Sequence, residues 1–286
     1  LVADLLEVVA HVLEREVGVV VALGEAVGAQ EFGEAVLVEG AVGALERRIG
    51  DDVAAVIVEP VQGVGGAYDM GAEYLAALRK RCDETGTPLI YASSAATYGD
   101  GEHGFDDDFS LAALKKLRPM NLYGWSKHLF DMAVVDRVVK KEKLPPQWAG
   151  LKFFNVFGPN EYHKGEMMSL VAKRFDDVKA GRTVKLFKSH KPGIEDGDQR
   201  RDFIYVDDVV RVMTWLLATP SVSGLFNVCT GHARSFRDLM LAAYAALGRE
   251  PRIEYIDMPE SIRNSYQYFT ESKGDRLCRA GYNGGF

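Results

Sequence analysis

Two short, continuous apolar runs joined by one helical pattern restrict this chain to an α/β fold. Residues 53–58 read Val-Ala-Ala-Val-Ile-Val, and residues 89–93 read Leu-Ile-Tyr-Ala-Ser. Runs without polar alternation are typical of strands buried on both faces of a parallel sheet. The residues between them predict a glycine-rich turn at 63–66 and a helix over 72–85, which Gly86 and Pro88 end. The pattern therefore predicts a β-α-β unit, the building block of a parallel sheet.

The alternation of strands and helices continues through most of the chain. Before the β-α-β unit, the spacing predicts an amphipathic helix over 2–16, a strand near 17–23 and a helix near 42–49. After it we expect helices over 121–143, 167–180, 207–218 and 235–247, and strands over 151–155, 202–206 and 225–228. Residues 184–200 predict a loop-rich insertion, and no closing helix is expected near the C-terminus, as in a truncated fragment.

Composition excludes several classes of function. A formal net charge of −7 argues against a sequence-independent nucleic-acid binder. The apolar run at 17–23 is far shorter than the roughly 20 residues that a membrane span needs, and no segment has the pattern of a signal peptide. The three cysteines, Cys82, Cys229 and Cys278, are widely separated, so they predict neither a disulfide framework nor a paired-cysteine metal site. A reducing cytoplasm fits them best.

The charge is divided unevenly along the chain. Residues 1–90 hold 6 basic and 16 acidic side chains, a net charge of −10, and contain neither Ser nor Asn. Residues 91–286 carry a net charge of +3. The change in composition indicates two segments of different origin, with a Val/Ala-rich helical lobe of a single domain as the simpler alternative.

One pair of side chains has a spacing with a chemical use. Tyr123 and Lys127 stand at positions i and i+4, on one face of a predicted helix and one turn apart. A nearby ammonium favours a phenolate, so such a tyrosine is suited to exchange a proton with a substrate hydroxyl. Ser94 follows a predicted buried strand, which places its hydroxyl at the carboxyl edge of the sheet, where open α/β folds bind ligands. An ordinary half-buried Tyr beside a solvated Lys is the alternative.

Further motifs give residues 91–286 a family resemblance. Tyr91-Ala-Ser-Ser-Ala-Ala-Thr-Tyr-Gly99 precedes the Tyr-x-x-x-Lys pair, and Phe154-Asn-Val-Phe-Gly-Pro159 and Arg201-Asp-Phe-Ile-Tyr-Val206 follow it. With these motifs the region resembles the extended short-chain dehydrogenases/reductases, the nucleotide-sugar epimerases and dehydratases. Asn155-Val-Phe-Gly-Pro-Asn-Glu-Tyr-His-Lys-Gly165 and Tyr266-Gln-Tyr-Phe-Thr270 resemble the ADP-glyceromanno-heptose 6-epimerase subfamily.

The resemblance implies a fold, a reaction and a set of site residues. The fold is a Rossmann-like parallel sheet with a small C-terminal substrate-binding lobe, and the enzyme is a cytoplasmic homo-oligomer. The reaction is NADP-assisted inversion at C6 of ADP-heptose through a transient ketone. The implied roles are Tyr123 and Lys164 as the two bases, Ser94 on the reacting oxygen, Lys127, Val156 and Lys164 on the cofactor, and Asn155, Arg201, Tyr266 and Phe187 on the substrate.

Some of these residues have ordinary structural alternatives. Arg201 suits a diphosphate, which a guanidinium binds through two parallel hydrogen bonds, but it is equally placed for an ion pair with Asp202 or Asp207. Lys164 taken alone predicts a solvated loop charge. Near Phe187 the sequence departs from the subfamily pattern, and so do Glu166 and Lys173, which puts substrate contact there in question.

The first 90 residues lack the opening that this family uses. A strand, Gly-x-x-Gly-x-x-Gly and a helix should bind the pyrophosphate, but Gly24, Gly28 and Gly33 have the wrong spacing and Tyr68 stands at the last glycine position after Gly63 and Gly65. Residues 41–79 instead resemble class III pyridoxal-phosphate aminotransferases. The strand at 89–93 carries no Asp for the pyridinium nitrogen, and the half with the Schiff-base lysine is missing, which argues against aminotransferase activity.

Two segments and several functions follow as hypotheses. We divide the chain into an atypical, aminotransferase-like segment at 1–90 and an epimerase-type catalytic and substrate-binding region at 91–286. The leading hypothesis is the heptose epimerase. The alternatives are a catalytically inactive chimera, a pyridoxal-phosphate enzyme, or another nucleotide-sugar epimerase or dehydratase. A dehydratase would show an acidic pair after Ser94, where this chain has Ala95 and Ala96.

We expect the chain to bind NADP weakly, because the glycine spacing is absent and the net charge of −10 on residues 1–90 repels a polyanion. Calorimetric titration with NADP measures this directly. Micromolar binding, about −8 kcal/mol, would contradict the expectation and show that another loop, with Gly63–Gly66 as the first choice, replaces the motif.

Overall fold

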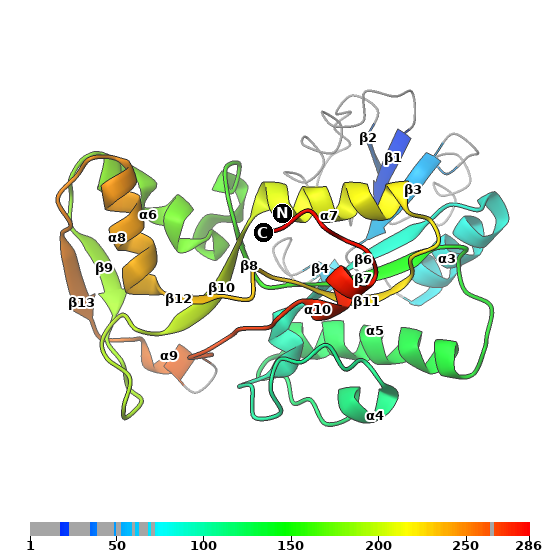
Figure 1. The fold of residues 1–286 in the computed structure, drawn as a ribbon, viewed down its shortest axis with the longest axis horizontal. Coiled ribbons are helices and arrows are strands. Elements are labelled where there is room, and N and C mark those ends of the chain that lie inside the picture. The colour runs from blue at the N-terminus through cyan, green and yellow to red at the C-terminus, as the bar shows by residue number, and fades with distance from the viewer. Residues whose placement is uncertain are drawn as a thin grey trace.

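The computed structural model describes residues 18–22, 35–38, 49, 53–58, 61–62, 68–69, 72–263 and 266–286. These residues form a larger part built on one sheet and a smaller lobe beside it (Figure 1). Apart from Ile49, the helices predicted at 2–16 and 42–49 and the turn predicted at 63–66 lie outside the described residues.

Six parallel strands form the central sheet in the spatial order β2-β1-β3-β6-β7-β11. They are β1 (Gly18–Ala22), β2 (Ala35–Val38), β3 (Val53–Val58), β6 (Leu89–Ser94), β7 (Trp148–Phe153) and β11 (Gly224–Val228). The predicted β-α-β unit is confirmed, since β3 pairs with β6 in parallel and α3 (Ala72–Thr85) joins them. If the six strands are numbered along the chain, their spatial order is 2-1-3-4-5-6. The usual dinucleotide-binding order is 3-2-1-4-5-6, in which the first strand lies beside the fourth. In this chain the third strand takes that place.

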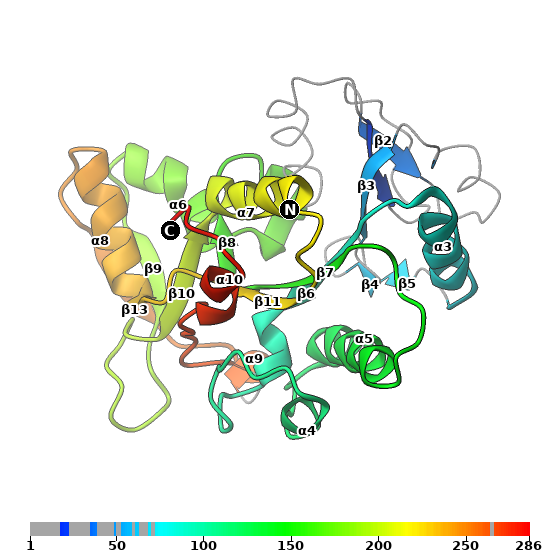
Figure 2. The same cartoon turned by 45° about the vertical axis from the view of Figure 1, so that its right-hand side comes forward.

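Both faces of this sheet are covered, which explains the continuous apolar runs. On one face Ile90 and Leu151 pack with the apolar side of α7 (Val206–Ala218). On the other face Tyr91 packs with residues of α3 and of α5 (Leu122–Val139). Figure 1 shows α7 and α5 on opposite sides of the sheet, and Figure 2 shows α3 beside β3. Alternate residues of one strand thus enter two separate cores.

The smaller lobe contains a strand pair that the sequence did not predict. β9 (Val184–Phe187) pairs in parallel with β13 (Ile253–Ile256), and α6 (Leu170–Lys179) and α8 (Phe236–Ala246) pack on them around a core that includes Leu186 and Tyr244. The prediction of a loop-rich insertion over 184–200 is therefore wrong at its start. The remaining residues to 199 contain no helix or strand.

A third, three-stranded sheet connects the two parts, in the order β12-β10-β8. Its strands are β8 (Asn155–Phe157), β10 (Arg200–Tyr205) and β12 (Ala233–Ser235). Near the C-terminus α10 (Asp275–Arg279) follows α9 (Glu260–Arg263), and Leu277 is fully buried in the core that α7 covers. The expectation of no closing helix is therefore corrected. No helix in the described part of the chain is long and apolar enough to cross a bilayer.

A fully buried ion pair links the sheet to α5. Lys152 of β7 donates to Asp131 of α5 at 2.6 Å and to Thr97 Oγ1 at 2.7 Å, and both charged side chains have 0% exposure. Ser93 Oγ of β6 donates to the same Asp131 oxygen at 2.7 Å. Burial lowers the pKa of Lys152, and the charge of Asp131 and its hydrogen bond oppose that shift. One network therefore joins α5 to two strands of the sheet.

We expect Asp131→Asn to lower the free energy of unfolding by roughly 3–5 kcal/mol, because it leaves the buried ammonium without its counter-charge. Urea unfolding followed by circular dichroism measures the loss.

The matched control is Asp136→Asn on the same helix. Asp136 pairs with Lys140 at 2.7 Å, but the two side chains are 38% and 59% exposed, so we expect a loss of about 1 kcal/mol or less. Equal losses in the two variants would contradict a special role for the buried pair.

Candidate active site

The first side chain of the site ends a central strand. Ser94 is the last residue of β6 and caps the short helix η1 (Ala95–Tyr98), with its hydroxyl accepting from Ala96 N at 3.1 Å. Thr97 Oγ1 donates back to the Ser94 carbonyl at 2.8 Å. The turn therefore holds a half-buried hydroxyl at the carboxyl edge of the sheet, as the sequence predicted.

Tyr123 and Lys127 lie in the first turns of α5, where the sequence placed them. Asn121 caps this helix by accepting from Gly124 N at 2.8 Å. The Lys127 ammonium lies 5.3 Å from the centre of the Tyr123 ring. Lys127 is 1% exposed and Tyr123 is 37% exposed, so a buried ammonium lies beside a partly exposed tyrosine ring.

A close backbone contact brings this helix to the Ser94 turn. A Cβ atom added at Gly124 would lie 2.7 Å from the Ala96 carbonyl oxygen, and helix α5 contacts η1 along this edge. Only a glycine permits such an approach. The helix start that carries Tyr123 and the turn that Ser94 caps are therefore neighbours.

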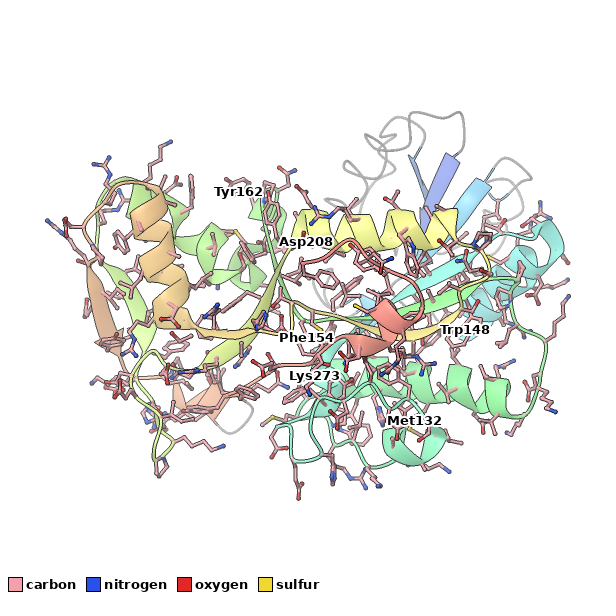
Figure 3. All side chains as sticks on the ribbon, in the orientation of Figure 1. Met132, Trp148, Phe154, Tyr162, Asp208 and Lys273 are labelled. Carbon is pink, nitrogen blue, oxygen red and sulfur yellow. The ribbon has the colours of Figure 1, made fainter. Side chains whose placement is uncertain are left out.

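Lys164 is not a solvated loop charge. It lies in the short helix η2 (Tyr162–Met167), is 8% exposed, and places its ammonium 3.3 Å from the Glu161 carboxylate. Tyr162, two residues before it, is 74% exposed and projects outward (Figure 3). The loop thus directs one side chain into the protein and the other to solvent.

Three of the predicted substrate residues form one cluster in the smaller lobe. The Arg201 guanidinium lies 5.2 Å from the centre of the Tyr266 ring, and Phe187 packs edge-on against that ring at 6.2 Å. Arg201 is 6% exposed and donates to the carbonyl oxygens of Arg200 and Gln267. Burial lowers the pKa of Arg201, and the nearby Tyr266 acts to raise it. Burial raises the pKa of Tyr266, and the charge of Arg201 acts to lower it.

The alternative ion pair of Arg201 with Asp202 or Asp207 is absent from the described residues. The Asp202 carboxylate instead accepts from Thr230 N and Oγ1, both at 2.7 Å, and from Gly231 N at 2.9 Å. Arg201 is therefore held by backbone carbonyls and aromatic rings rather than by a carboxylate of the described residues.

The last two predicted residues stand on β8. Asn155 pairs with Phe203 of β10, and Val156 pairs with Ile204. This register places both two to three residues along the sheet from Arg201. Strand β8, which carries Asn155 and Val156, is therefore paired directly with β10, which carries Arg201.

The structure also shows polar residues that the motifs did not single out. Glu161 binds Lys164, and Asp131 and Lys152 link α5 to the sheet. Asp131 lies one turn beyond Lys127, and Glu161 lies inside the motif at 155–165. Nearness to a predicted site residue was therefore the only sequence feature that pointed to either of them. Asp131 and Lys152 are 21 residues apart, so no local pattern shows that pair, whereas Glu161 and Lys164 are only three residues apart.

The described residues fit one end of a dinucleotide better than the other. At the nicotinamide end, the buried Lys127 ammonium beneath Tyr123 suits a ribose hydroxyl. At the other end, β3 stops at Val58, a strand pair of β4 (Val61–Gln62) and β5 (Tyr68–Asp69) follows, and α3 begins only at Ala72. Among the described residues, no helix therefore starts directly after β3, where a helix N-terminus beside β6 would bind the pyrophosphate.

Comparison with known proteins gives two family matches. The model of the NAD dependent epimerase/dehydratase family matches residues 67–229, and that of class-III aminotransferases matches residues 18–92. An ADP-L-glycero-D-manno-heptose-6-epimerase of Nitratidesulfovibrio vulgaris (strain DP4) is 51% identical over 208 residues, which are 73% of this chain and 62% of that protein. One of Fusobacterium nucleatum is 49% identical over 207 residues, 70% of this chain and 61% of that protein. The chain thus spans about three-fifths of the length of these curated relatives.

Solved structures share the fold at lower identity. The Helicobacter pylori ADP-L-glycero-D-manno-heptose-6-epimerase has a TM-score of 0.70 and 20% identity, covering 96% of this chain and 86% of that one. The Thermus thermophilus UDP-glucose 4-epimerase complex with NAD has a TM-score of 0.65 and 19% identity, covering 93% of both chains. The predicted Rossmann-like fold with a smaller lobe is confirmed.

We expect Gly124→Ala to lower the free energy of unfolding by about 1–3 kcal/mol, because the new methyl group overlaps the Ala96 carbonyl. Without that overlap, replacing glycine by alanine in a helix interior would raise the free energy of unfolding by about 1 kcal/mol. The sign of the measured change therefore shows whether the close contact exists. Chemical denaturation measures it.

Ser126→Ala in the same helical turn is the control, with an expected change within about 0.5 kcal/mol. A Gly124→Ala variant more stable than wild type would contradict the close contact.

Proposed function

Because the chain belongs to the NAD dependent epimerase/dehydratase family, we propose that it is a nucleotide-sugar epimerase acting at C6 of an ADP-linked heptose. The names of relatives at about 50% identity support this substrate. The resemblance also supports a cytoplasmic enzyme that works as a homo-oligomer.

The Arg201 cluster carries the proposal. Arg201 is buried, makes no ion pair among the described residues, and has its donors held between two backbone carbonyls and two aromatic rings. A buried cation without a counter-charge favours an anion as ligand, and a guanidinium binds a diphosphate through parallel hydrogen bonds. Tyr266 and Phe187 then provide apolar surface for the rest of the nucleotide sugar.

The proton transfers belong to the two proposed bases. Tyr123 removes or returns the proton of the C6 hydroxyl on one side, and Ser94 donates a hydrogen bond to the same oxygen. Lys164 performs the equivalent transfer on the other side. Two bases are needed because C6 has the opposite configuration in substrate and product, so its hydroxyl points to opposite sides. When bound, a nicotinamide cofactor supplies the hydride exchange at C6 that accompanies each proton transfer.

We propose NADP as that cofactor, with Lys127 on its ribose and Val156 and Lys164 near the nicotinamide. The proposal includes weak affinity, because the described residues fit the nicotinamide end and not the pyrophosphate end. Below millimolar NADP, turnover is then limited by cofactor binding rather than by the acid–base groups. An inactive chimera would bind the nucleotide sugar and never turn over.

We expect the chain to interconvert the C6 epimers of ADP-glycero-manno-heptose when NADP is added at millimolar concentration. Tyr123→Phe removes the transferring hydroxyl and should lower kcat by about 100-fold or more. Proton NMR of the sugar follows the conversion. Tyr162→Phe, on an exposed ring, should leave the rate unchanged.

A neighbouring pair of arginines separates binding from chemistry. Arg201→Met should raise KM roughly tenfold or more, because it removes charge-assisted hydrogen bonds. Arg200→Met should not, since Arg200 is exposed and pairs with Asp198 at 3.3 Å. ADP binding without conversion at any NADP concentration would overturn the proposed activity in favour of the inactive chimera, and loss of both would also overturn nucleotide-sugar binding.

A further inference from the structure

One buried carboxylate organises the loop that carries Lys164. Glu161 is 4% exposed and accepts four hydrogen bonds. The donors are Gly158 N at 3.2 Å, Ser169 Oγ at 2.6 Å, Ser169 N at 2.9 Å and Lys164 Nζ at 3.3 Å. Both carboxylate oxygens are used, because Gly158 N and Ser169 Oγ reach Oε1 while Ser169 N and Lys164 reach Oε2.

The donors come from three separate places in the fold. Gly158 directly follows β8, Lys164 lies in η2, and Ser169 is the cap of α6. Ser169 Oγ also accepts from Ala172 N at 3.2 Å, so the same hydroxyl begins the helix and holds the carboxylate. Glu161 therefore fixes both ends of the loop and its lysine to one point.

The electrostatics keep Glu161 ionised. Burial acts to raise the pKa of Glu161, but the Ser169 donors and the Lys164 ammonium outweigh it and hold that pKa below its ordinary value. The three donors other than Lys164 are neutral. The carboxylate thus remains hydrogen-bonded whichever protonation state Lys164 adopts.

We propose that Glu161 is the positioning residue for Lys164, holding its amine on the inner side of the loop in both protonation states. This inference rests on the proposed function, in which Lys164 is one of two bases. A base that cycles between ammonium and amine must return to the same place. Glu161 has three hydrogen-bond donors besides Lys164, so its position in the loop does not depend on Lys164 alone.

The test measures the accessibility of individual lysines in the full chain by brief acetylation with an N-hydroxysuccinimide ester and peptide mass spectrometry. In the wild type we expect Lys164 to react much more slowly than Lys185, which is exposed on β9. Glu161→Gln should raise the Lys164 rate about tenfold, the factor that loss of one charge-assisted hydrogen bond gives. Lys152, with 0% side-chain exposure, should stay unlabelled in both and so reports that the fold is intact.

The matched control removes a carboxylate of a different pair. Glu142 is 44% exposed and pairs with Arg137 at 3.3 Å, so Glu142→Gln should leave Lys164 labelling unchanged. If Glu161→Gln fails to fold, Lys152 becomes labelled and Ser169→Ala decides instead. That variant removes one donor from Glu161 and should raise the Lys164 rate by a smaller factor.

Activity gives an independent readout that separates the two proposals. In an active chain Glu161→Gln should lower kcat about tenfold or more while KM changes less than about twofold, because the amine is misplaced and the Arg201 cluster is untouched. Lys164 labelling at the wild-type rate in folded Glu161→Gln or Ser169→Ala would overturn the positioning role, whatever the activity. Absent epimerisation in the wild type would overturn the proposed function and leave the labelling result standing.

Discussion

The ion pair between Lys152 and Asp131 sets the geometry on which the site depends. Lys152 and Asp131 are both 0% exposed, and Ser93 and Thr97 each add one hydrogen bond to the pair, while Asp131 Oδ1 has no hydrogen-bond partner among the described residues. Ser93 precedes Ser94 in β6, Thr97 lies in the turn that Ser94 caps, and Asp131 lies one turn along the helix from Lys127. The pair therefore fixes the strand end, the turn and the helix relative to one another. Gly124 then closes the remaining gap at Ala96.

Local patterns predicted the elements that are buried on both faces and missed those held by distant partners. The apolar run at 53–58 matches β3 residue for residue, because both faces of the sheet are covered. The helix at 72–85 matches α3, because Tyr74 and Leu78 on one side are buried while residues such as Lys80 are exposed. β9 is four residues long, and its partner β13 lies about 70 residues later, so no window of sequence contains both. α5 ends at Val139 rather than at 143, since Lys141 adopts a left-handed conformation with φ of 56°.

The candidate site divides in the same way. The spacing of Tyr123 and Lys127 is a property of one helix, so the sequence was sufficient to predict that the two side chains lie together. The freedom of Arg201 from Asp202 was not predictable, because it depends on Thr230 and Gly231 taking that carboxylate from another segment. The role of Glu161 was missed for a different reason, since Gly158 and Ser169 lie within eight residues of it but the loop conformation that turns their donors toward its carboxylate has no sequence motif.

The strand order of the main sheet has a consequence for its cooperativity. β3, β6, β7 and β11 form a continuous four-stranded block, and β1 joins it only along the outer edge of β3 while β2 is attached through β1. The block contains the strands next to both proposed bases and most of the apolar contacts of α5 and α7. Without β1 and β2, strand β3 would become an edge strand, but the pairings of β3 with β6, β6 with β7 and β7 with β11 would all remain. The strands that hold the candidate site therefore form a unit whose strand pairing does not depend on β1 and β2.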